Sequence, residues 1–137
     1  MKPEAKTPGP ATVLIVEDSV LIRMPIATYL RDCGYRVIEA ASSDEALLVL
    51  QHHTKVDVLF SDVEVAGAVD AFGLSQWARK NRPEIKVVLA GSPKTAAKAA
   101  GKLCEEGPNL TKPYEPEAVE DYIRRLLALQ TIGESSS

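Results

Sequence analysis

The sequence alternates short apolar runs rich in Val, Ile and Leu with longer segments in which apolar residues recur every three or four positions. This alternation is typical of strand–helix–strand units, which build a parallel sheet with helices on both faces. The apolar runs are nearly uninterrupted, as expected for strands that are covered on both sides. We therefore predict an α/β fold with these strands: Thr12–Glu17, Tyr35–Glu39, Val56–Asp62, Lys86–Ala90 and Asn109–Thr111.

A helix is predicted after each of these strands. Ser42 and Glu45 have the spacing of a capping box, so the second helix should begin near Ser43. Gly34 stands where a left-handed cap would end the first helix, and Pro116 suits the first position of the last one. The predicted helices cover residues 22–33, 43–52, 72–81, 95–106 and 116–129.

The length of 137 residues suits one compact domain, and 45% apolar with 26% charged residues is globular usage. Both ends are poor in large apolar side chains and rich in Pro, Gly or Ser, so they cannot bury enough surface to become ordered. We predict a single domain over residues 12–129, with flexible tails at 1–11 and 130–137.

The charge pattern and the apolar runs exclude several classes of protein. A formal charge of −3, with scattered Lys and Arg, argues against a nucleic-acid partner. No apolar run approaches the roughly 18 residues of a membrane span, and residues 1–12 lack the core of a signal peptide. We expect a cytoplasmic protein that does not bind membranes, with Cys33 and Cys104 as buried, reduced thiols.

Acidic residues stand at the ends of two predicted strands. Glu17 and Asp18 end the first strand, and Asp62 ends the third. Right-handed connections bring the carboxyl ends of all parallel strands to one edge of the sheet, where ligands bind. Carboxylates that meet there repel one another unless a cation joins them. Mg²⁺ is the natural cation, because it prefers oxygen and commonly binds one or two carboxylates together with phosphate oxygens.

Three motifs mark the strand ends, and their order and gaps are specific in combination. They are Val13–Asp18, Leu59–Val63 and Thr111–Tyr114. With these motifs, residues 12–129 resemble the receiver domain of two-component response regulators. The resemblance implies a flavodoxin-like (βα)5 three-layer sandwich, with a five-stranded parallel sheet in the order 2-1-3-4-5. It also implies a signalling protein and not an enzyme.

The resemblance further implies a role for each residue at this edge. Asp62 would accept a phosphoryl group from a histidine kinase or a histidine phosphotransfer protein. Glu17 and Asp18 would hold Mg²⁺ together with Asp62, and the backbone carbonyl of Glu64 would complete the protein ligands. Lys112 would contact the phosphoryl oxygens as a mobile positive charge. A nucleophile, a metal and a positive charge are what phosphoryl transfer needs.

The sequence departs from the receiver pattern where a phosphorylation signal is usually read. Ala90 or Gly91 stands where receivers carry a Thr or Ser that bonds the phosphoryl group. Either Ser92 supplies that hydroxyl, or the backbone amides of Gly91 and Ser92 replace it. Asn109 stands in place of the usual switch aromatic.

The loop after Asp62 also departs from the pattern. The residues Val65–Ala68 replace the common Met-Pro pair. Gly67 has high backbone freedom, so we expect a looser loop over the site.

Signalling by protein contact is expected, because no output domain is recognised in the sequence. The resemblance implies a downstream target or a self-dimer on the face formed by residues 95–106, 109–111 and 116–129. Lys94, Lys98 and Lys102 form a basic stripe there, which suits either an acidic partner or solvent.

Three other functions compete with that of a phosphate-accepting receiver. A degenerate receiver would dock partners without phosphorylation. An active receiver is favoured over it, because all the residues for metal binding and phosphoryl transfer are present and the departures lie where the signal is read. A flavodoxin-like ligand binder is disfavoured, because Glu17-Asp18-Ser19 is acidic where a phosphate cradle needs Gly and hydroxyl donors. Asp62-Val63-Glu64 resembles the paired acids of phosphatases of the haloacid dehalogenase type. This rival is disfavoured, because Asp62 ends the third predicted strand, whereas the paired acids of that family should follow the first.

Overall fold

The computed structural model describes residues 10–52, 54–65, 67–91, 110–111 and 115–136, and the side chains of these residues except 110–111 and 129–136. Its parallel sheet has the strand order β2-β1-β3-β4-β5, which confirms the predicted fold class and order. The strands are β1 (Thr12–Val16), β2 (Arg36–Ala40), β3 (Val58–Asp62), β4 (Lys86–Gly91) and β5 (Leu110–Thr111).

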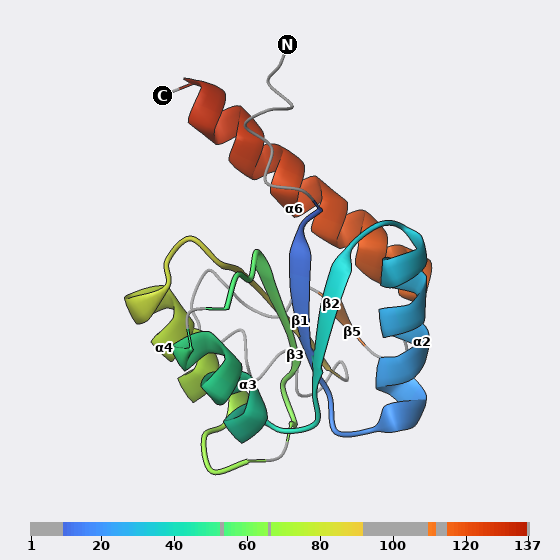
Figure 1. The fold of residues 1–137 in the computed structure, drawn as a ribbon, viewed down its shortest axis with the longest axis vertical. Coiled ribbons are helices and arrows are strands. Elements are labelled where there is room, and N and C mark those ends of the chain that lie inside the picture. Colours follow the sequence, from blue (N-terminus) through green and yellow to red (C-terminus); the bar gives the residue numbers. More distant parts are fainter. Residues whose placement is uncertain (1–9, 53, 66, 92–109, 112–114, 137) are drawn as a thin grey trace.

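Helices cover both faces of the sheet, so the described residues form the predicted three layers (Figure 1). On one face lie α2 (Val20–Asp32) and α6 (Pro116–Ser136). On the other lie α3 (Ser43–Gln51) and α4 (Ala71–Asn81). All described strands run toward the edge drawn at the bottom of Figure 1, where the first turn of α2 also lies. None of the described helices is both long and apolar enough to cross a membrane. The prediction that Cys33 is buried is wrong, because this residue caps the end of α2 and is exposed.

Two hydrophobic cores hold the layers together, one on each face. In β1, Leu14 and Val16 belong to the core under α3 and α4, while Val13 and Ile15 belong to the core under α2 and α6. This alternation follows from the two-residue period of a strand. Both sets are fully buried, which explains why the strand runs are apolar without interruption.

Two helix ends show how far local sequence determines structure. The predicted start of the second helix is confirmed: the Ser42 hydroxyl accepts a hydrogen bond from the Glu45 amide, and the Glu45 carboxylate accepts one from the Ala41 amide. The predicted end at Leu129 is wrong, because α6 continues to Ser136. Extending a formed helix adds one hydrogen bond per residue fixed, so a weak stop signal does not end it.

A hydrogen bond from Tyr35 to Glu120 ties the start of β2 to α6. The phenol donates to a Glu120 carboxylate oxygen at 3.0 Å, between residues far apart in the sequence. Partial burial, together with this hydrogen bond and the negative charge of Glu120, raises the pKa of Tyr35 to about 12. The folded protein therefore keeps the phenol proton at a pH where the unfolded chain loses it.

Replacing Tyr35 by Phe should lower the free energy of unfolding near neutral pH by about 1 kcal/mol, the usual contribution of one hydrogen bond. The raised pKa of Tyr35 determines how this difference in the free energy of unfolding depends on pH. The contribution of Tyr35 is complete below pH 10, the unfolded pKa, and falls as pH rises toward 12. Urea unfolding of both proteins at several pH values measures this difference. A constant difference across this range would contradict the assigned bond.

Candidate functional site

The acidic residues meet because β1 and β3 are paired in parallel. Val16 lies opposite Ser61 in the register of the two strands. Glu17 follows Val16 and Asp62 follows Ser61, so both acids lie at the same level of the sheet edge. Asp62 is also the last residue of β3 and lies opposite Ala90 on β4.

Three carboxylates form the centre of the site. Glu17, Asp18 and Asp62 each offer one oxygen, and these oxygens lie within 4.8 Å of one another. Glu17 and Asp62 are buried, whereas Asp18 is exposed. The predicted cluster is thus confirmed as a geometric arrangement. Burying like charges side by side is costly unless a cation compensates them, so these three carboxylates could hold a metal ion.

Backbone and side-chain contacts hold Glu17 in place. Its amide donates to the Ala40 carbonyl at 3.0 Å, and one of its carboxylate oxygens accepts from the Ser19 amide at 3.0 Å. Its carbonyl accepts from the Arg23 guanidinium at 2.7 Å. Glu17, the residue directly after β1, is therefore connected to β2, to the following loop and to α2.

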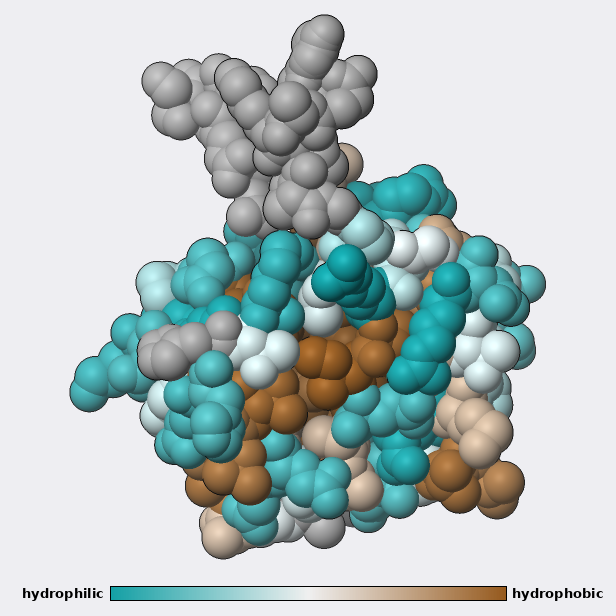
Figure 2. All heavy atoms as spheres, viewed as in Figure 1, coloured by the Kyte–Doolittle hydropathy of each residue, from teal (hydrophilic) through white to brown (hydrophobic). Residues whose placement is uncertain are grey.

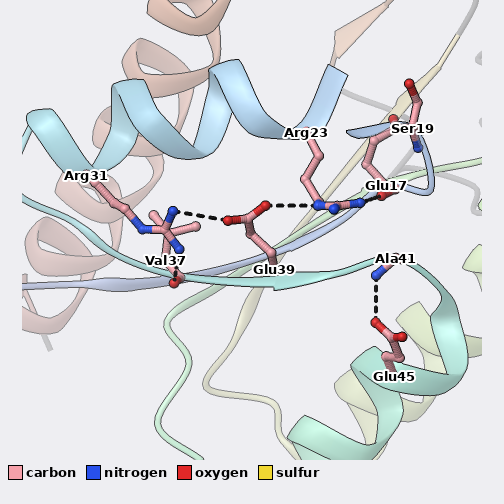
Figure 3. A network of polar contacts seen from close by, with 8 residues as sticks. All are labelled: Glu17, Ser19, Arg23, Arg31, Val37, Glu39, Ala41 and Glu45. Carbon is pink, nitrogen blue, oxygen red and sulfur yellow. Dashed lines mark hydrogen bonds and ion pairs between the residues drawn. The ribbon is translucent and has the colours of Figure 1, made fainter. Parts of the chain in front are cut away.

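Arg23 belongs to an ion-pair network that the sequence pattern did not reveal (Figure 3). Arg23 and Arg31 bind the two carboxylate oxygens of Glu39, at 2.9 and 3.0 Å. Partial desolvation acts to raise the pKa of Glu39, but the hydrogen bonds and charges of the arginines outweigh it and hold that pKa below its usual value. A possible signal in the sequence was the pair of Arg residues two turns apart on one predicted helix.

The loop after Asp62 is bound to the start of α3, which corrects the expectation of a looser loop. The Ser43 hydroxyl donates to the Val69 carbonyl, and the Ala68 amide donates to the Asp44 carboxylate. Gly67 has φ of +142°, and a Cβ added there would clash with the Ser43 hydroxyl oxygen. The positive φ and the close approach both require glycine here, while the hydrogen bonds to Ser43 and Asp44 hold the loop against α3.

The two described residues at the end of β4, Ala90 and Gly91, carry no side-chain hydroxyl. Ala90 is buried in the core under α2 and α6, and its carbonyl accepts from the Val63 amide at 2.7 Å. Gly91 is the last residue of β4. Of the two candidate positions for the missing hydroxyl, Ala90 is the one that lies opposite Asp62, and how the phosphoryl group is bonded there stays a prediction.

Several predicted residues lie outside the described part of the chain. These include Ser92, Asn109 and Lys112, as well as the predicted helix at 95–106. Glu64 is described, in the turn directly after β3, and its role as a backbone ligand stays a prediction.

Comparisons with known sequences give one consistent family. Residues 13–124 match the family model of the response regulator receiver domain. The chain is 30% identical over 128 residues to response regulator Rre1 of Synechocystis, covering 88% of this chain and 53% of that protein. It is 42% identical over 82 residues to the sensor kinase CckA of Brucella abortus, covering 59% and 9%. The chain thus spans about half the length, or less, of these curated relatives.

Solved structures give the same fold. NtrX from Brucella abortus superposes with a TM-score of 0.81 at 24% identity, covering 93% of this chain and 29% of that one. The chemotaxis response regulator CheY4 of Vibrio cholerae superposes with a TM-score of 0.68 at 27% identity, covering 85% and 98%. The likeness to CheY4 extends over nearly all of that chain.

Mg²⁺ should raise the thermal midpoint of unfolding, because the three carboxylates meet in the folded protein and not in the unfolded chain. At a free concentration of 100 times the dissociation constant, binding adds about 2.7 kcal/mol to the free energy of unfolding. Changing both Glu17→Gln and Asp18→Asn should remove the effect in differential scanning calorimetry. Asp32→Asn, an exposed acid at the end of α2, is the control and should keep it. An equal shift in the double variant would place the cation elsewhere.

Proposed function

Because this chain belongs to the response regulator receiver domain family, we propose that Asp62 accepts a phosphoryl group from a phosphohistidine in a Mg²⁺-dependent reaction. The phosphorylated chain would then signal by contact with another protein. The observation that carries this proposal is the meeting of Glu17, Asp18 and Asp62 at the carboxyl edge of the sheet.

The donor set of the site fits Mg²⁺. All three ligand atoms would be carboxylate oxygens, which hard cations prefer. Asp18 is exposed, so one side of the cluster opens to solvent, as suits an ion that keeps several waters. We assign the remaining protein ligand to the backbone carbonyl of Glu64. When bound, Mg²⁺ would neutralise the negative charge of the carboxylates and the phosphoryl oxygens.

Asp62 is the nucleophile in this proposal. One carboxylate oxygen forms a bond to phosphorus while the phosphorus–nitrogen bond of the donor breaks. The electron pair of that bond stays on the ring nitrogen, and a proton on the other ring nitrogen leaves the donor histidine neutral. The product on Asp62 is an acyl phosphate. The chain's contribution is mainly position, since the pairing of β3 with β1 and β4 fixes the residue at its strand end.

We assign the contacts with the phosphoryl oxygens to Lys112 and to the end of β4. Lys112 follows directly after β5, and Ser92 follows directly after β4. Both strands run parallel to β3, so their carboxyl ends share its edge of the sheet. Because Ala90 has no hydroxyl, either Ser92 or the backbone amides of Gly91 and Ser92 would bond the new phosphoryl group.

The donor is proposed to be a histidine kinase or a histidine phosphotransfer protein that docks beside the acidic cluster. Val20, Leu21 and Met24 are exposed large apolar residues on the first turns of α2, close in the chain to Asp18. Apolar surface is visible over this end of α2 at the lower right of Figure 2. Exposed apolar groups beside a charged site indicate a contact surface for another protein.

Incubation with phosphoramidate and Mg²⁺ should add the mass of one phosphoryl group to the intact protein. Asp62→Asn should abolish the gain, because it removes the attacking carboxylate oxygen. The control Asp32→Asn should be phosphorylated like the wild type. An unchanged wild-type mass with phosphoramidate and with acetyl phosphate would instead favour the degenerate receiver that docks partners without phosphorylation.

The proposed docking surface predicts different effects with protein and small-molecule donors. Leu21→Ser should lower the rate of phosphotransfer from a histidine kinase, found by a phosphotransfer screen, about tenfold. The variant should leave the rate with phosphoramidate unchanged, because the small donor needs no docking. Leu48→Ser is the matched control: Leu48 is 55% exposed and Leu21 83%, but Leu48 lies on α3, in the other helical layer. Equal rates for Leu21→Ser and the wild type would contradict docking on α2.

A further inference from the structure

We propose that Arg23 is a positioning residue, which holds the backbone of Glu17 so that the carboxylates at the end of β1 are aligned to bind the cation. The inference rests on the proposed Mg²⁺ site and adds to it a residue that contacts neither the metal nor the phosphoryl group. Figure 3 shows the contacts that support it.

The guanidinium of Arg23 joins the site to the second strand. Its Nη1 donates to the Glu17 carbonyl at 2.7 Å, and its Nε donates to Glu39 Oε1 at 2.9 Å. Arg31 binds the other side of Glu39, with Nη1 donating to Oε2 at 3.0 Å and Nη2 donating to the Val37 carbonyl at 3.0 Å. Glu39 therefore fixes the orientation of the guanidinium that reaches Glu17.

The position of Arg23 in the first turn of α2 makes this contact possible. Its amide donates to the Ser19 carbonyl at 2.9 Å, so the loop that carries Asp18 leads directly into the turn that carries Arg23. Side chains of a helix point back toward its N-terminus, which directs Arg23 over this loop. The Arg23 side chain is only 16% exposed, against 48% for Arg31. Arg23 is thus well ordered by its surroundings, as a positioning residue must be.

Glu39 also offsets the charge of Arg23. A free guanidinium beside a cation site would repel the metal, but Arg23 is paired with a carboxylate. The arginine hydrogen bonds keep the pKa of Glu39 below its usual value, so this carboxylate stays ionised at neutral pH. The site therefore gains a strong hydrogen-bond donor to Glu17 with little cost in repulsion.

Three roles for Arg23 predict three different effects on Mg²⁺ affinity. Positioning predicts that Arg23→Met weakens Mg²⁺ binding roughly tenfold or more, as is usual when a group that orients metal ligands is lost. A purely electrostatic role predicts tighter binding, because a positive charge has been removed. A role in the packing of α2 against β2 alone predicts lower stability with unchanged affinity. The last two results would each overturn the proposal.

Arg31→Met is the matched control, because it also removes one arginine from Glu39 but leaves the contact to the Glu17 carbonyl. It should bind Mg²⁺ like the wild type. Arg23→Lys keeps the charge but has a single nitrogen, so it cannot donate to Glu17 and Glu39 from two fixed nitrogens. It should recover part of the affinity. If Arg31→Met loses as much affinity as Arg23→Met, the contact to Glu17 is not what matters.

Isothermal titration calorimetry of Mg²⁺ into the full chain, without a phosphodonor, measures these affinities directly. Circular dichroism and thermal unfolding check that each variant is folded. If Arg23→Met does not fold, Arg23→Lys and Glu39→Gln are titrated instead: weaker binding in both supports positioning, and wild-type affinity in both overturns it. A wild-type chain that binds no Mg²⁺ would reject the proposed function itself. Wild-type binding with equal binding by the variants would reject the role of Arg23 alone.

Discussion

The parallel pairing of β1 with β3 is the constraint on which the rest of the structure depends. Its register places Val16 opposite Ser61, and the next residue on each strand is a buried acid, Glu17 or Asp62. A slip of one residue would turn every side chain of a strand to the other face. Both faces of the sheet are close-packed against helices, so packing far from the acids fixes their relative position.

The carboxyl edge of the sheet combines a firmly held backbone with closely spaced acidic side chains. Burying Glu17 and Asp62 near Asp18 opposes folding through repulsion, and a divalent cation would turn that cost into affinity. The polar contacts around Glu17 keep its backbone from relaxing away from the other acids. Arg23 and Glu39 extend this support from the loop to α2 and β2. The fold therefore holds the three carboxylates close together, an arrangement that a divalent cation would stabilise.

The sequence predicted the architecture and the acidic cluster, because both depend on local patterns and on topology. Periodicity located the strands to within about two residues, and parallel topology then brought Glu17 and Asp62 to one edge. The pattern could not show that Arg23 binds Glu39, sixteen positions away, because that contact depends on side-chain conformations across two elements. Gly67 was read as a source of freedom, although it permits close packing against the start of α3. Such packing depends on tertiary contacts that local sequence does not specify.

In the proposed function, Asp62 becomes an acyl phosphate in a site that needs a divalent cation. Borohydride reduction tests it most directly, since it converts an aspartyl phosphate into homoserine, which peptide mapping then locates. After treatment with phosphoramidate, we expect homoserine at position 62 when Mg²⁺ is present and none when Mg²⁺ is chelated. A phosphorylated protein that yields no homoserine at position 62 would rule out Asp62 as the acceptor, and an equal yield without a divalent cation would rule out the need for Mg²⁺.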